Sequence, residues 1–98
     1  MYARVHVLET TPEQSDVGLE IVRDQLLPWL RDASGYRGLI RLLDREAGKT
    51  LVVTLWADEQ SMLESADAGR GLGALAAEAS GSKRIALEDF EVTFVQLS

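Results

Sequence analysis

The sequence predicts an α+β domain in which a strand, a helix, two strands, a second helix and a last strand follow one another. Three observations lead to this prediction. Residues 2–9 alternate in the manner of a strand, residues 12–33 repeat apolar side chains at helical spacing, and residues 51–56 form a short apolar run between turn residues. A polar turn at residues 44–48 joins the second and third strands into a hairpin, so we expect an antiparallel sheet.

The first strand, at residues 2–9, carries large side chains on both of its faces. One face holds Tyr2, Arg4, His6 and Leu8, and the other holds Ala3, Val5 and Val7. We therefore expect this strand to be buried on both sides.

The first helix is expected to follow Thr11. Pro12 suits the first helical position, and Gln14 completes a capping box with Thr11. The apolar stripe of this helix comprises Leu19, Val22, Leu26, Leu30 and Ala33, with Trp29 at its border. Pro28 lies roughly opposite the stripe and predicts that the helix bends around a sheet.

After the first helix ends at Ser34 and Gly35, a second strand is expected at residues 39–45 and a third at residues 51–56. The third strand is apolar enough to require cover on both faces. Asp58 caps a second helix, whose stripe includes Met62, Leu63 and Ala66 before Gly69, Gly71 and Gly73 interrupt it. Residues 85–97 alternate and predict a long last strand.

The order β-α-β-β-α-β is the ferredoxin-like split arrangement, a four-stranded antiparallel sheet with the helices on one face. We expect residues 1–98 to form a single domain of this kind. Two helices leave the other face of the sheet uncovered, although it carries apolar side chains of the first strand. A second copy related by two-fold symmetry would cover it, so we expect a homodimer in which two sheets form an α/β barrel.

Composition argues against several classes of function. A formal net charge of −6 and a pI near 4.6 disfavour nucleic-acid binding. The chain has no cysteine and a single histidine, so neither a disulfide framework nor a transition-metal site is expected. No apolar run is long enough for a membrane span and residues 1–10 lack a signal pattern, which predicts a cytoplasmic protein without membrane contact.

Three stretches resemble the antibiotic-biosynthesis-monooxygenase superfamily of dimeric α/β barrels. They are Gly35-Tyr36-Arg37-Gly38, the hairpin turn with Asp44 and Gly48, and VTLWADEQSM at residues 53–62. The resemblance covers essentially the whole chain. It implies a pocket between sheet and helices in each subunit, and a family that includes cofactor-independent monooxygenases of aromatic polyketides and quinols as well as haem-degrading enzymes.

The haem site of the haem-degrading members is not expected in this chain. Those members are expected to have an asparagine on the first strand, where this chain offers His6, and a tryptophan in the helix after the third strand, where it offers Ser65. Residues 69–77 contain no histidine that could serve as the haem ligand. We therefore expect no cofactor, and the resemblance implies that Trp56 is a structural residue of the fold.

His6 is the candidate catalytic base, because a histidine is the one side chain whose unperturbed pKa suits proton transfer near neutral pH. If its face of the strand looks toward the helices, the imidazole could take a proton from a phenol or quinol. Trp29, Tyr36 and Arg41 are the candidate pocket residues around a small aromatic ligand.

Structural interpretations of the same residues stay open at this point. His6 could be a hydrogen-bonded buried histidine, the two tryptophans could be core residues, and Arg4 and Arg41 could be rim residues paired with carboxylates. The sequence therefore leaves two functions: a cofactor-independent monooxygenase, or a non-catalytic small-ligand-binding or accessory protein that keeps the barrel.

Overall fold

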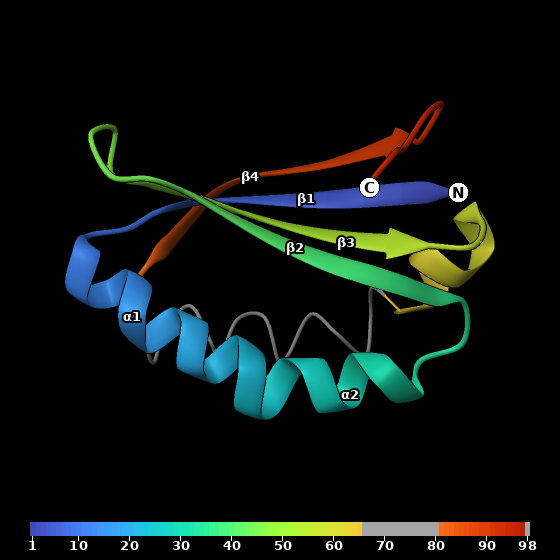
Figure 1. Ribbon diagram of the computed structural model, residues 1–98, viewed down its shortest axis with the longest axis horizontal. Helices are drawn as coiled ribbons and strands as arrows, with labels where there is room; N and C mark the ends of the chain where they lie inside the picture. The colour runs from blue at the N-terminus through green and yellow to red at the C-terminus, as the bar shows by residue number, and fades with distance from the viewer. Residues whose placement is uncertain (66–80, 98) are drawn as a thin grey trace.

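The computed structural model describes residues 1–65 and 81–97, and four strands form one sheet in it (Figure 1). The strands are β1 (Tyr2–Glu9), β2 (Tyr36–Asp44), β3 (Lys49–Trp56) and β4 (Lys83–Glu91). Their order in the sheet is β2-β3-β1-β4, and every neighbouring pair is antiparallel. The helices α1 (Pro12–Ile21) and α2 (Leu27–Asp32) lie on one side of this sheet. The predicted ferredoxin-like α+β fold is confirmed.

The start of α1 is closed by the predicted capping box. The Gln14 backbone N–H donates to Thr11 Oγ1 at 3.2 Å, and the Thr11 N–H donates to Gln14 Oε1 at 2.9 Å. Two backbone donors that have no partner inside the helix are thereby satisfied.

A π-helical turn, Val22–Leu26, separates α1 from α2 and lies just before Pro28. Proline has no N–H to donate, and in a regular α-helix its ring clashes with the preceding turn. The wider π turn at this point relieves that clash. The π turn encloses one more residue per hydrogen bond, which rotates α1 relative to α2. As a result Ser15 is buried and Leu19 is 46% exposed, so the predicted place of Leu19 in the apolar stripe was wrong.

The connection from α2 to β2 depends on Gly35, which has a φ of 80°. That angle favours glycine, and the Gly35 carbonyl accepts a hydrogen bond from the Ala57 N–H at 2.7 Å. β2 begins at Tyr36, earlier than the predicted start at residue 39, because Tyr36 pairs with Trp56 at the end of β3. The hairpin between β2 and β3 turns at Gly48, with a φ of 65°, as predicted.

The core lies between the sheet and α2. Its fully buried members are Leu30, Trp56 and Met62. Asp58 caps the helical turns that follow β3, since Ser61 N–H donates to Asp58 Oδ1 at 2.7 Å. Leu63, predicted to share the stripe of Met62, is 50% exposed instead. Ala66 and the three glycines expected to break this helix lie outside the described residues.

β4 ends at Glu91, so the prediction of one strand over residues 85–97 was wrong. The physical reason is the length of its neighbour. β4 pairs only with β1, and the last contact along that edge is the Val92 N–H donating to Met1 O at 2.8 Å.

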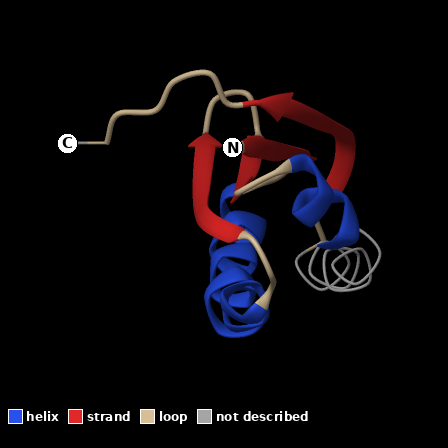
Figure 2. Ribbon diagram, turned by 90° about the vertical axis from the view of Figure 1, so that its right-hand side faces the viewer, coloured by secondary structure: helices blue, strands red, loops and turns tan. Residues whose placement is uncertain are grey.

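The sheet face opposite the helices is apolar and incompletely covered. It carries the buried Ala3 and Val7 at its centre, while Ile40, Leu42 and Phe90 remain 37%, 49% and 49% exposed. Figure 2 shows α1 and α2 below the sheet and the C-terminal segment running out above it. Within residues 1–65 and 81–97, no helix has the length and apolar character that crossing a membrane would require.

Candidate functional site

The helix-facing side of the sheet presents its side chains in rows that cross the strands. Strand register places Arg41, Val52, His6 and Leu87 in one row, Leu39, Thr54, Arg4 and Asp89 in the next, and Tyr36, Trp56, Tyr2 and Glu91 in the third. Tyr2 and Tyr36 pack against the buried core beside Leu30 of α2, which identifies this as the face toward the helices.

His6 sits half-buried at the centre of its row, between Val52 of β3 and Leu87 of β4. Burial, with smaller effects from the charges of Arg84 and Arg4, lowers the pKa of His6 from 6.5 to about 4, against the opposing effect of Asp89. The imidazole is therefore neutral at pH 7, and it presents one nitrogen that accepts and one that donates.

Arg4 and Asp89 form a bidentate ion pair next to His6. Arg4 Nε lies 2.7 Å from Asp89 Oδ1, and Arg4 Nη2 lies 3.0 Å from Asp89 Oδ2. Arg4 is 9% exposed on the central strand β1, so its predicted carboxylate partner exists but its predicted place at the rim was wrong. The hydrogen bonds from Arg4 hold the pKa of Asp89 below its usual value, and burial of the carboxylate opposes that shift.

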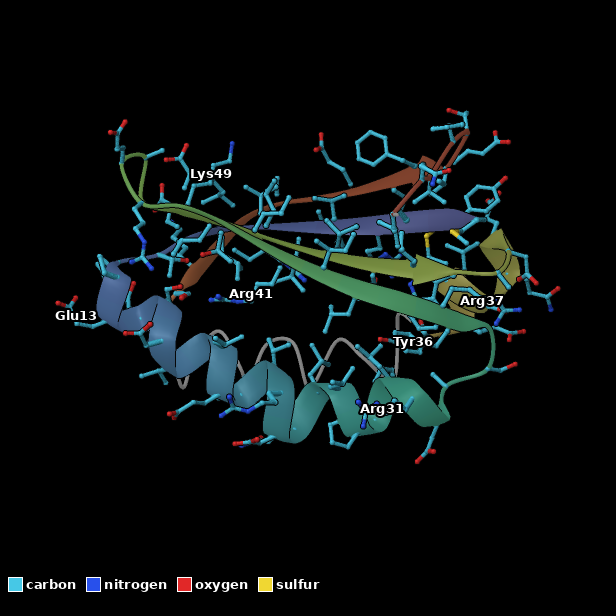
Figure 3. The ribbon with its side chains drawn as sticks, viewed as in Figure 1. Glu13, Arg31, Tyr36, Arg37, Arg41 and Lys49 are labelled. Carbon is cyan, nitrogen blue, oxygen red and sulfur yellow. The ribbon has the colours of Figure 1, made fainter. Side chains whose placement is uncertain are left out.

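Arg41 reaches from β2 toward α1, into the layer between sheet and helix (Figure 3). Its Nη2 donates to the backbone oxygen of Ser15 at 2.9 Å and to Ser15 Oγ at 3.2 Å. Burial lowers the pKa of Arg41, and the charge of Asp16 works in the other direction. Within the described parts of the chain no carboxylate lies at ion-pair distance from this guanidinium, so its direct hydrogen bonds there go to neutral oxygens.

Trp29 and Tyr36 belong to the aromatic core around Trp56. The rings of Tyr36 and Trp56 meet edge to face, with centroids 6.1 Å apart and planes at 74°. Trp56 is 2% exposed, and its Nε1 donates to Thr54 Oγ1 at 3.0 Å. The structure thus places Trp56 in the structural role that the sequence suggested.

The four candidate residues form two groups. His6 and Arg41 share one row with Val52 between them, which sets their backbones roughly 10 Å apart. Trp29 and Tyr36 lie near the row of Trp56, and Tyr2 in that row is four residues from His6, or roughly 13 Å along an extended strand. A flat ligand of two or three fused rings would be needed to touch both groups.

Sequence reasoning did not single out Asp89, Ser15 or Arg84 as neighbours of the candidate site. Alternation along β4 could have placed Asp89 on the face of Leu87, but the register that brings it opposite Arg4 depends on long-range pairing. The contact of Ser15 with Arg41 could not be predicted from the sequence, because the π turn changes which side of α1 faces the sheet.

The described residues contain no group of three or more histidine, cysteine, aspartate or glutamate side chains arranged to hold a metal ion. An open, acidic depression on the helical turns after β3 is lined by Glu59, Gln60, Leu63 and Glu64. None of these residues belongs to the row of His6, so the depression is separate from the candidate site.

Comparisons with solved structures decide the fold. A Deinococcus radiodurans protein provisionally assigned as an antibiotic biosynthesis monooxygenase superposes with a TM-score of 0.74 at 13% identity, over 100% of this chain and 98% of that one. The monooxygenase ActVA-Orf6 of Streptomyces coelicolor, solved with nanaomycin D, gives 0.68 at 13% identity over 99% and 91%. The chain has the fold of the antibiotic biosynthesis monooxygenases. SnoaB of Streptomyces nogalater, a cofactor-independent oxygenase, shares this monooxygenase fold with a TM-score of 0.71 at 11% identity over 96% and 94% of the two chains.

This monooxygenase fold carries more than one chemistry. It also occurs in a dimeric ferredoxin-like protein from an uncultured marine organism and in the heme degrader MhuD of Mycobacterium tuberculosis, solved with two hemes in its active site. Where heme degraders are expected to have a tryptophan, this chain has Ser65, whose Oγ donates to the Met62 carbonyl of its own helix at 2.7 Å. Fold alone therefore does not select the reaction.

Sequence comparison finds relatives of unassigned function. One Mycobacterium tuberculosis protein is 31% identical over 67 residues, which is 68% of this chain and 28% of the relative. A second is 28% identical over 92 residues, which is 94% of this chain and 41% of the relative. The chain thus spans less than half the length of these curated relatives. No protein-family model matches it.

Proposed function

We propose that this protein is a cofactor-independent monooxygenase acting on a small aromatic, quinol or polyketide-type molecule bound between the sheet and the helices. The observation that carries the proposal is the row on the helix-facing side that holds a neutral imidazole, His6, and a guanidinium, Arg41, which donates to the neutral oxygens of Ser15. The occurrence of the same fold in cofactor-independent oxygenases supports it.

The chemistry needs a substrate that becomes electron-rich when it loses a proton. A CH₂ group beside a phenol or carbonyl loses H⁺ to a base, and the resulting anion passes an electron to O₂. Recombination of the two radicals forms a C–O bond, and protonation gives a hydroperoxide. Loss of water then leaves a carbonyl, so CH₂ and O₂ become C=O and H₂O without an external reductant.

In this proposal His6 accepts the proton and Arg41 stabilises the substrate anion. An imidazole of pKa about 4 is a weak base toward a phenol of pKa about 10, and the six-unit gap amounts to roughly 8 kcal/mol. A positive charge beside the forming anion reduces that gap, and the anion in turn raises the pKa of the imidazole. The site therefore favours substrates such as anthrones, whose CH₂ group gives an anion delocalised over fused rings, over simple phenols.

Oxygen uptake with a panel of anthrones and hydroquinones tests the proposal, with the wild-type protein compared with His6→Ala and Arg41→Gln. We expect each substitution to lower turnover by about 100-fold on the substrate that reacts best. Arg23→Gln, which removes an exposed guanidinium of the opposite helix surface, is the matched control and should leave turnover unchanged. Equal rates for wild type and His6→Ala would exclude His6 as the base.

The second candidate function is a non-catalytic small-ligand-binding or accessory protein. The depressed basicity of His6 favours this alternative, because a neutral imidazole with so low a pKa serves well as a hydrogen-bonding group in a binding site. Saturable quenching of tryptophan fluorescence by a panel compound, without oxygen uptake for any compound, would support binding over catalysis.

We also propose that the protein is a homodimer in which the two sheets pack face to face. The incompletely covered apolar face that carries Ile40, Leu42 and Phe90 supports this arrangement. Two-fold packing would bury the face with one interface, and a dimeric protein with the same fold exists. Light scattering at micromolar concentration tests it, and a stable monomer would contradict it.

A further inference from the structure

Two buried threonines at the α1 end of the sheet have side-chain hydroxyls without a hydrogen-bond partner. Thr50 of β3 is 0% exposed, and Thr10, which follows β1, is 5% exposed. In the portion of the chain that the structure describes, neither Oγ1 atom makes a hydrogen bond. A buried hydroxyl without a partner costs free energy, and such groups are rare in native proteins. These two hydroxyls therefore need an explanation.

Strand register places the two threonines beside the candidate site. His6 and Arg41 flank β3 in one row, and Thr50 lies in the next row on the same face of the sheet. Thr50 is thus a diagonal neighbour of both, at roughly 7–8 Å between backbones. The Thr10 N–H donates to the Gly48 oxygen at 2.8 Å, which extends the pairing of β1 with β3 and makes Thr10 a diagonal neighbour of Thr50 as well.

The guanidinium of Arg41 has donors to offer at the same place. Its Nη2 donates to the backbone oxygen and to Oγ of Ser15, at 2.9 and 3.2 Å, and among the described residues its hydrogen bonds use Nη2 alone. A guanidinium also carries N–H donors on Nε and Nη1. Asp16 acts on Arg41 through its charge from beyond ion-pair distance. An oxygen that carries negative charge is the partner that suits both these donors and the threonine hydroxyls.

The edge of the sheet at β2 gives a ligand its approach to this group. Arg41 is half-buried on β2, which is an edge strand, and it lies in the layer between the sheet and α1 (Figure 3). From that edge the strand order is β2, β3, β1, so a ligand meets Arg41 first, Thr50 next and His6 last.

We propose that Thr50 and Thr10, together with Arg41, hold the negatively charged oxygen of an aromatic ligand that extends toward His6. The diagonal from Thr50 to His6 matches a ligand whose charged oxygen and reacting carbon lie on opposite sides of one ring. The hydroxyls gain their partner when the ligand binds, which explains why they lack one in the free protein. This inference deepens the proposed function, on which it rests for the aromatic nature of the ligand.

The first test measures binding of two probes of nearly the same shape, 2-naphthoate and 2-naphthamide, by isothermal titration calorimetry. Naphthoate carries a carboxylate on the ring, whereas naphthamide is neutral. We expect the wild-type protein to prefer naphthoate by about tenfold or more. Thr50→Val should weaken naphthoate binding by about tenfold and change naphthamide binding by less than about threefold, and Thr10→Val should act in the same direction. Equal affinities in the wild type, or an unchanged preference in Thr50→Val, would overturn the proposal.

The second test measures the thermal midpoint without ligand, which separates a ligand-binding hydroxyl from a structural one. Thr50→Val removes a buried hydroxyl that has no partner, so we expect the midpoint to rise by about 2 °C or more. Thr54→Val is the matched control on the same face of β3, because Thr54 Oγ1 accepts from Trp56 Nε1 at 3.0 Å. It should lower the midpoint and leave the preference for naphthoate unchanged. A lower midpoint in Thr50→Val would mean that its hydroxyl serves the fold, for example through a buried water, and would overturn the proposal.

Two further measurements separate this inference from its neighbours. Inorganic phosphate that displaces naphthoate, where chloride at the same ionic strength does not, would assign the group to a free anion and overturn the aromatic ligand. Oxygen uptake that depends on His6 but not on Thr50 would overturn this inference and leave the proposed function standing. The expected probe preference without oxygen uptake for any compound would support the oxygen-binding group and reject the monooxygenase.

Discussion

At the scale of single residues, the helix-facing side of the sheet combines buried charge with a neutral histidine. The Arg4–Asp89 pair satisfies one guanidinium with a carboxylate, whereas Arg41 finds only the neutral oxygens of Ser15 among the described residues. His6 lies on β1 between these two environments, and burial is the main cause of its low pKa. The charge distribution around the candidate site thus follows from which arginine has an acidic partner.

Asp89→Asn should destabilise the fold by about 2 kcal/mol at pH 7, because it removes the charge that compensates the buried Arg4. Urea denaturation measures the loss. Asp24→Asn, in the exposed pair with Arg23, is the control and should change stability by less than about 0.5 kcal/mol.

The folded-state pKa of Asp89 is depressed, so the contribution of Asp89 to the stability of the fold is present above the unfolded pKa and is lost as pH falls through the folded value. Wild type should therefore lose more stability than Asp89→Asn on acidification below pH 4.

His6 should remain neutral down to about pH 4, which proton NMR can follow as one signal because the chain has a single histidine. The folded pKa lies below the unfolded one, so the folded state binds fewer protons between them. Stability is then full above about pH 6.5 and declines by up to about 3 kcal/mol as pH falls to about 4. His6→Gln should lack this decline. An NMR midpoint near 6.5 would contradict the burial of the imidazole.

At the scale of elements, the connections decide which side chains meet. The π turn before Pro28 rotates α1 so that Ser15, and not Leu19, faces the sheet and meets Arg41. The sharp turn at Gly35 allows Tyr36 to pair beside Trp56. Neither candidate group would be in place without these local departures from regular helix and strand.

Gly35→Ala should destabilise the protein by about 2 kcal/mol or more, for two reasons. An alanine at a φ of 80° is strained, and its Cβ would overlap the side chain of Ser61. Thermal denaturation of Gly35→Ala beside Gly35→Ala/Ser61→Gly separates the two effects, because the double variant keeps the strain and relieves the overlap. Gly48→Ala is a control with a similar φ of 65° and only an ordinary contact with the Thr10 carbonyl. A loss no larger than that of Gly48→Ala would show that the overlap has no consequence.

At the scale of the whole molecule, one face of the sheet is covered by helices and the other is not. The open face carries the apolar side chains of Ile40, Leu42 and Phe90, which the described residues of one chain leave partly exposed. Association of two copies would cover this face, and it would make the stability of the fold depend on protein concentration.

The thermal midpoint of the wild-type chain should therefore rise with protein concentration, because unfolding separates the two copies. Differential scanning calorimetry over a hundredfold range of concentration measures this dependence. A midpoint that does not change with concentration in the wild type would contradict an obligate dimer.

The sequence by itself determined the order of elements, the capping box at Thr11 and the turn at Gly48, because each depends on local spacing or backbone preference, and the family resemblance implied the structural role of Trp56. The sequence also placed His6 on one face with Arg4. Only the tertiary structure decided that Asp89 pairs with Arg4, that Ser15 holds Arg41, and that β4 stops at Glu91. Strand register and the length of a neighbouring strand are properties of long-range pairing, and the π turn changes helix phase in a way that a regular 3.6-residue spacing cannot predict.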